Sequence, residues 1–181
     1  EEGVAAEKVW TRDNGPAGWT VDDSGVPGVT EDGDISNDGM TEWAGWSFAN
    51  KDWWVETAGD QDRSQFSRGV GTVAIADPDE WDDNTHAPSA ENGWFETHLT
   101  TPEISLDGVD PESLFLQFSS SWRPEFDDNY HQSVEVTVSY DGGDPQQLLL
   151  WLSDGSSPNF KGAATNESVI LDLANPAGAQ N

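Results

Sequence analysis

Regular alternation of apolar and polar residues is clearest in the second half of the chain. Residues 114–118 and 134–140 place large apolar side chains at every second position, as strands with one buried face do. A turn rich in Gly and Asp follows at 141–145, and the apolar stretch 146–152 then returns the chain, which predicts a β-hairpin. One more strand is predicted over 168–173.

The remaining strands are short and separated by turns. Pro102 breaks a stretch that otherwise has the pattern of one strand, and 18 Gly and 10 Pro recur throughout the chain. Few long windows show the period of about 3.6 residues that is typical of a helix. These features predict an all-β protein, either a sandwich or a barrel. The short strands are expected at 8–11, 43–48, 71–76, 95–101 and 104–106.

We expect one domain over residues 1–181, because neither a repeat nor a low-complexity linker divides the chain. Its parts nevertheless differ in composition. Residues 1–93 are rich in Trp and in loops, residues 94–173 hold the regular strands and the hairpin, and residues 174–181 form a tail.

The order of strands in the second half follows a family pattern. A Pro-x-Ile-x-Leu strand precedes an alternating Leu and Phe strand and a Val-rich hairpin. The pattern runs through residues 99–106, 113–122 and 134–140, and it closes with Asp141-Gly142-Gly143. This order resembles jelly-roll modules of the MAM and laminin-G-like kind, over residues 94–173. The resemblance implies an antiparallel β-sandwich of jelly-roll type.

Two further expectations come from this resemblance. The remainder of the chain, through residues 43–48 and 76–83, is similar to accessory β-sandwich modules of secreted hydrolases and phosphatases of marine bacteria. Such modules end in another strand, whereas this sequence has none after Leu173. We therefore expect either a truncated piece or an open sheet edge that a strand from another chain can fill.

The charge balance restricts the partners. The chain has 35 acidic and 7 basic side chains, a net charge of −28, which argues against nucleic acid and against an anionic membrane surface. Ten Trp and seven Phe argue for a folded chain rather than a disordered one. No apolar stretch is long enough to span a membrane. Adaptation to high salt and binding of divalent cations both explain the acidic excess, and both suit a secreted, extracellular protein.

An acidic stretch that follows the strand 71–76 is the candidate calcium site. Ca²⁺ prefers carboxylate and carbonyl oxygens supplied by a loop, and a dense group of carboxylates is costly without a cation. A solvated acidic loop is the alternative. The predicted ligands are Asp77, Asp79, Glu80, Asp82 and Asp83.

Four tryptophans are the candidate carbohydrate-binding residues. Trp53 and Trp54 are adjacent, so on an extended chain their rings point to opposite sides, and at least one is exposed. Trp81 and Trp94 lie beside acidic or Gly-rich loops. An exposed indole stacks on the apolar face of a sugar while nearby polar groups bind its hydroxyls. Packing at the ends of the sandwich is the alternative role for all four.

Catalysis has little support in the motifs. No nucleophile elbow or phosphate-binding loop occurs, and the absence of Cys excludes a thiolate nucleophile. His86, His98 and His131 lack the spacing of a zinc site. Arg63 and Arg123 are expected in structural ion pairs.

The sequence therefore predicts a secreted, non-catalytic recognition module that binds carbohydrate and is stabilised by Ca²⁺. The alternative is a structural or adhesive module that assembles with other chains, into filaments for instance, through an open sheet edge. A hydrolase using a pair of carboxylates is the third hypothesis.

Overall fold

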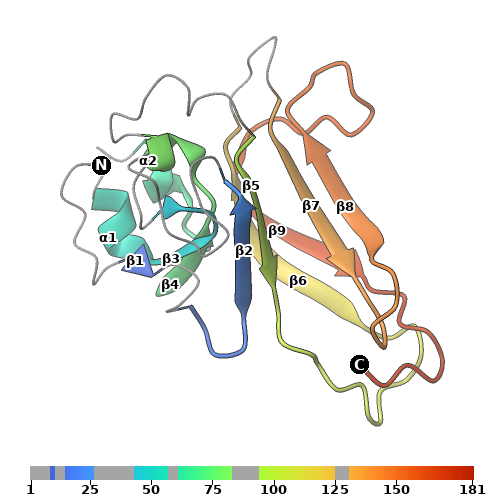
Figure 1. Cartoon of the computed structure of the whole chain (residues 1–181). Coiled ribbons are helices and arrows are strands. Elements are labelled where there is room, and N and C mark those ends of the chain that lie inside the picture. Colours follow the sequence, from blue (N-terminus) through green and yellow to red (C-terminus); the bar gives the residue numbers. More distant parts are fainter. Residues whose placement is uncertain (1–8, 11–14, 27–42, 57–60, 83–93, 125–130) are drawn as a thin grey trace. The chain divides into compact units, whose positions relative to one another are not determined.

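The protein is all-β, with antiparallel strand pairs and very little helix, which confirms the predicted fold class (Figure 1). The computed structural model describes residues 9–10, 15–26, 43–56, 61–82, 94–124 and 131–181. These residues belong to two compact units. The first comprises Glu1–Ser64 and Gly69–Pro102, and the second comprises Gln65–Arg68 and Glu103–Asn181. The prediction of a single domain stays a prediction, because compactness does not test whether either unit folds alone.

The first unit holds a small sheet and a two-stranded ribbon. In the sheet, β3 (Ser47–Asn50) lies between β1 (Val9–Trp10) and β4 (Thr72–Ile75), antiparallel to both. The ribbon pairs β2 (Thr20–Gly25) with β5 (Glu96–Thr100). Buried aromatic and aliphatic side chains form the core of this unit, among them Trp43, Phe48, Trp54, Ile75 and Trp81.

Two short helices in this unit replace predicted extended or loop structure. Helix α1 (Lys51–Glu56) begins at Asn50, whose Oδ1 accepts hydrogen bonds from the amides of Asp52 and Trp53, each at 3.1 Å. Helix α2 (Pro78–Asp82) begins after Asp77, with proline at its first position. The prediction of an extended chain at Trp53 was therefore wrong, and so was that of a loop at 77–83 over residues 78–82.

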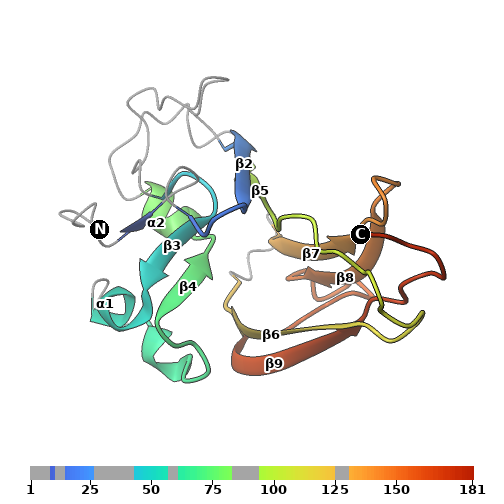
Figure 2. The same ribbon diagram turned by 90° about the horizontal axis from the view of Figure 1, so that it is seen from below.

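The second unit consists of two antiparallel pairs that lie as separate layers (Figure 2). One pairs β6 (Phe115–Trp122) with β9 (Ala164–Asp172), and the other pairs β7 (Ser133–Val138) with β8 (Gln146–Leu152), the predicted hairpin. The rings of Trp122 on β6 and Trp151 on β8 lie 6.1 Å apart between their centroids. Lys161 Nζ lies 4.8 Å from the Trp151 ring centroid and forms a 2.7 Å ion pair with Glu167 on β9. The arrangement is consistent with a sandwich.

A short piece from the middle of the chain completes the second unit. Gln65–Arg68 lies along β9, where Asn166 accepts a hydrogen bond from the Arg68 amide at 2.9 Å and donates one to the Ser67 hydroxyl at 2.9 Å. The Thr165 hydroxyl donates to the Gln65 side chain at 3.0 Å. Three of these four residues thus bind to a strand about a hundred positions later in the sequence.

The tail after Leu173 turns back on the loops of the second unit. Asn175 is buried: its Oδ1 accepts hydrogen bonds from the amides of Ser113 and Leu114, and its Nδ2 donates to the Asp110 carbonyl. The Leu106 amide donates to the Gln180 carbonyl at 2.8 Å. This contact replaces strand pairing, so the short strand predicted at 104–106 is wrong. Among the described strands β9 pairs with β6, and filling of its other edge by a partner stays a prediction.

None of the helices in the described ranges combines the length and the apolar character needed to cross a bilayer.

Tyr140 gives a test of how the tail region is held. Its hydroxyl donates to the Leu173 carbonyl at 2.5 Å, and burial, with the nearby Asp172 carboxylate, raises the pKa of the phenol. A raised pKa in the folded state means that this stabilisation is present below the ordinary pKa of about 10 and is lost as the pH rises through the folded value. Tyr140→Phe should cost about 1 kcal/mol at neutral pH. It should also remove part of the alkaline loss of stability.

Denaturant unfolding of both proteins, at neutral pH and at about pH 11, measures this. If the difference between wild type and Tyr140→Phe is the same at both pH values, the Tyr140 phenol does not titrate in the way described.

Candidate functional site

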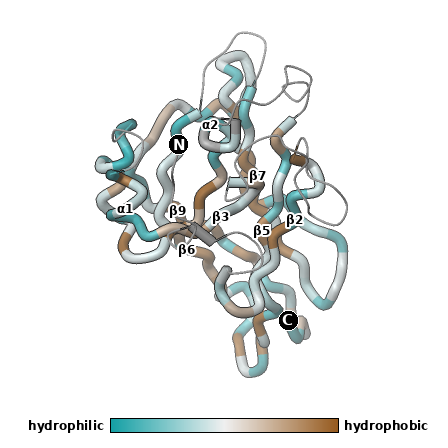
Figure 3. Tube along the Cα trace, turned by 60° about the vertical axis from the view of Figure 1, so that its left-hand side comes forward, coloured by the Kyte–Doolittle hydropathy of each residue, from teal (hydrophilic) through white to brown (hydrophobic). Residues whose placement is uncertain are grey.

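The solvent-exposed face of the β2–β5 ribbon gathers polar side chains next to an exposed Trp. Exposure alternates from Trp94 to Thr100, so Trp94, Glu96, His98 and Thr100 share the outer face of β5 and its approach. Figure 3 colours most of the two strands as hydrophilic or neutral, because Val21 and Leu99 are their only strongly hydrophobic residues. Trp94 has 67% of its surface exposed, the largest value of any described Trp.

A β-bulge in β2 shapes this face. Asp22 pairs with His98 and Gly25 with Glu96, so three steps along β2 match two along β5. Gly25 permits the close approach, because a Cβ there would lie 2.8 Å from the Glu96 Cβ and 2.9 Å from its carbonyl oxygen. The bulge leaves Asp22 and Ser24 both exposed, with Asp23 buried between them.

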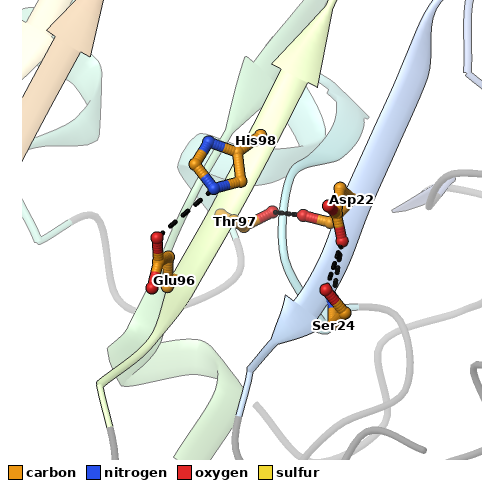
Figure 4. Close-up of polar contacts among 5 residues, drawn as sticks. All are labelled: Asp22, Ser24, Glu96, Thr97 and His98. Atoms are coloured by element: carbon orange, nitrogen blue, oxygen red, sulfur yellow. Dashed lines mark hydrogen bonds and ion pairs between the residues drawn. The ribbon is translucent and has the colours of Figure 1, made fainter. Parts of the chain in front are cut away.

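The charged groups of the face are set in defined positions (Figure 4). Asp22 Oδ1 accepts hydrogen bonds from the Ser24 hydroxyl at 2.6 Å and the Ser24 amide at 3.0 Å. These bonds, opposed by slight desolvation and aided by His98, lower the pKa of Asp22. On β5, Glu96 Oε1 lies 3.4 Å from His98 Nε2. The face therefore offers an ionised carboxylate, a second carboxylate and an imidazole beside an indole ring.

Thr97 attaches the opposite face of the ribbon to the rest of the first unit. Its hydroxyl donates to the Asp22 carbonyl at 3.1 Å and accepts from the Trp46 amide at 3.1 Å. Gly45, at φ 86°, lies against it, since a Cβ on Gly45 would be 2.7 Å from Thr97 Oγ1. One face of β5 is thus held by buried structure, and the other remains open to solvent.

The four predicted carbohydrate-binding tryptophans differ in their exposure to solvent. Trp54 and Trp81 are 8% and 6% exposed and have the packing role that was the alternative for them. Trp53 is half-buried on α1. Trp94 presents its ring to solvent, so it is the predicted residue that belongs to the face described above.

The predicted calcium ligands lie in and around α2. Asp77 lies 3.5 Å from the guanidinium of Arg63, the structural ion pair expected for that arginine. Asp79 is exposed in the first helical turn, Glu80 and Asp82 belong to the same helix, and Asp83 lies outside the described residues. Within the described ranges, no three His, Asp or Glu side chains converge in a way that could hold a metal ion. Calcium binding stays a prediction.

The sequence has two histidines besides His98. His86 lies outside the described residues, and His131 is half-buried beside β7. Sequence reasoning missed Asp22, Ser24 and Glu96 as site residues. The Asp-Asp-Ser-Gly run of β2 has the composition of a turn, and nothing local signals that it pairs with residues 96–100.

Gly45 gives a test of how firmly the ribbon is held. Gly45→Ala should destabilise the first unit by more than the roughly 1–2 kcal/mol of a positive φ alone, because the new methyl group would collide with Thr97. Gly71→Ala is the matched control, since Gly71 has φ 66° and open space around its Cβ position.

Hydrogen exchange of the β2 and β5 amides, read with denaturant unfolding, measures both variants. Equal losses in the two variants would show that Thr97 moves aside and that the joint with Gly45 is loose.

The functional conclusion rests on the geometry described above, because comparisons with known proteins add nothing to it. No family model, curated protein or solved structure matches the chain. The likeness to MAM and laminin-G-like modules therefore stays a prediction from the residues.

Proposed function

We propose that this protein is a secreted, non-catalytic module that binds carbohydrate through the outer face of the β2–β5 ribbon. The observation that carries the proposal is Trp94, whose ring is largely exposed at the end of a row of polar side chains. Leaving an indole in water forgoes a large burial free energy, which a sugar stacked on it recovers. Hydrogen bonds to the sugar hydroxyls then supply orientation.

The polar groups beside Trp94 suit this role. Asp22 and Glu96 are acceptors, His98 can donate or accept, and the hydroxyls of Thr20 and Thr100 face the same side at the far end of the ribbon. Because the pKa of Asp22 is lowered, its carboxylate is a poor proton donor near neutral pH. This supports binding rather than acid catalysis.

Substitution of Trp94 tests the proposal. Trp94→Ala should weaken retention on polysaccharide about tenfold or more, because truncating a central aromatic anchor typically costs ~2 kcal/mol. The fold should persist, since little of the ring is buried. Phe115→Ala is the matched control: this aromatic residue is 62% exposed on β6, which belongs to the second unit.

Affinity electrophoresis against a panel of neutral and charged polysaccharides measures both variants, with circular dichroism as the check of folding. If Trp94→Ala binds every polysaccharide as the wild type does, the ribbon face is not the site.

Assembly with other chains is the second candidate function. Phe115 and Ile170 are diagonal neighbours on the outer face of the β6–β9 pair, and both are largely exposed. Light scattering of the wild type and both variants tests this. An oligomer that Phe115→Ala dissociates and Trp94→Ala leaves intact would favour assembly over carbohydrate binding.

Stabilisation by Ca²⁺ belongs to the same proposal and has its own test. If the acids from Asp77 to Asp83 bind calcium, excess chelator should lower the melting temperature, and Asp79→Asn should remove that response. Asp52→Asn is the matched control, because Asp52 occupies the first turn of α1 as Asp79 does in α2. Both substitutions remove a favourable interaction between a carboxylate and a helix N-terminus. A loss of the chelator response in Asp79→Asn alone is therefore an effect of the metal and not of the helix. A melting temperature that chelator leaves unchanged contradicts calcium binding.

A further inference from the structure

The ribbon face carries the carboxylates of Asp22 and Glu96 and one imidazole, that of His98. The residues of β2 are Thr, Val, Asp, Asp, Ser and Gly, and those of β5 are Glu, Thr, His, Leu and Thr. Lys and Arg are therefore absent from both described strands. A glycan lying on this face meets the carboxylates of Asp22 and Glu96 directly. A uronic acid or a sulfated sugar would be repelled there.

The Asp22 carboxylate can accept a further hydrogen bond from a ligand. Both hydrogen bonds from Ser24 go to Oδ1, so among the described residues Oδ2 accepts none. The two bonds from one neighbour also fix the orientation of the carboxylate before any ligand arrives. A rigid, ionised acceptor of this kind is best matched by a charged donor such as an ammonium group.

Trp94 favours the same class of ligand. The face of an indole ring attracts cations, and Trp is the strongest of the aromatic side chains in this respect. Two residues along a strand span about 7 Å, so the Glu96 side chain is within reach of a sugar that stacks on Trp94. An ammonium group on that sugar gains from the ring and from the carboxylate together.

We propose, on the basis of the carbohydrate-binding function above, that the ribbon face selects glycans whose amino groups are free and protonated. Glucosamine polymers without N-acetyl groups belong to this class. The stacking Trp94 supplies affinity for sugar in general. The carboxylates of Asp22 and Glu96 supply the preference for the cationic form.

Titration calorimetry of the full chain with three short oligosaccharides tests this: glucosamine, N-acetylglucosamine and galacturonic acid oligomers at mildly acidic pH. His98→Gln is measured beside the wild type, because His98 shares this face with the two carboxylates, and the preference for the free amine should persist in it. The glucosamine oligomer should bind about tenfold more tightly than its acetylated form, since its ammonium groups add charge pairs and a cation–π contact to the stacking. The galacturonic acid oligomer should not bind.

Two pairs of variants separate the site from the overall charge of the protein. Asp22→Asn and Glu96→Gln should each reduce the preference for the free amine about two- to fivefold. Asp107→Asn and Asp144→Asn change the net charge equally at exposed positions of the second unit, and they should leave the preference unchanged. Asn at position 22 keeps an oxygen that can accept from Ser24, so the bulge is retained.

The outcomes distinguish this inference from the proposed function. Equal binding of the three oligosaccharides, lost in Trp94→Ala, overturns the selection of amino groups and leaves carbohydrate binding in place. Equal effects of all four acidic substitutions show attraction by bulk charge, which also overturns it. If no oligosaccharide or polysaccharide binds in a manner that depends on Trp94, both proposals fail.

Discussion

A buried guanidinium holds the helical part of the first unit together. Arg63 is 1% exposed, in a chain where acidic residues outnumber basic ones fivefold. Its Nη1 donates to the Trp54 carbonyl at the end of α1, and its Nη2 reaches Gln61 and the Asp77 carboxylate before α2. Its Cζ also lies 5.0 Å from the centroid of the Trp54 ring. A buried charge is tolerated when it is paired and hydrogen-bonded in this way, so the positions of both helices and of Trp54 depend on one side chain.

The ribbon depends on a second, smaller arrangement of the same kind. The Thr97 hydroxyl uses both its donor and its acceptor capacity, and it joins β2, β5 and the segment before β3 in one place. The inner face of the ribbon is attached to the rest of the unit through Thr97. The side chains of the outer face are therefore not needed for this attachment. A surface supported in this manner can present Trp94 and the Asp22 carboxylate without the loss of order that loops entail.

The parts of the fold that were predictable are those whose pattern is local. The hairpin of β7 and β8 follows from alternation on both sides of a Gly-rich turn, and the structure has it where it was expected. Helices α1 and α2 are too short to show periodicity, and their signals were the caps, Asn50 in one case and Asp77-Pro78 in the other. The acidic run that suggested a metal loop is in part a helix start, where carboxylates are favourable without any cation.

The site itself was less accessible to prediction. The sequence predicted Trp94 as a binding residue because it is a Trp beside a Gly-rich loop. The burial of Trp54 and Trp81 depends on tertiary packing, which cannot be deduced from composition. The pairing of Asp22 with His98 depends on a register between strands far apart in the sequence, with Thr97 and Asp22 separated by 75 positions. A bulge that shifts this register by one residue decides which side chains share the face.

The position of the segment Gln65–Arg68 in the sequence limits how the second unit can be transferred by recombination. The first unit is made of two stretches of chain, and the four residues between them belong to the second unit. A recombination event with one breakpoint at residue 102 would transfer the strands of the second unit without Ser67 and the Arg68 amide, which bind the Asn166 side chain. A transfer of residues 103–181 alone would therefore leave the second unit incomplete.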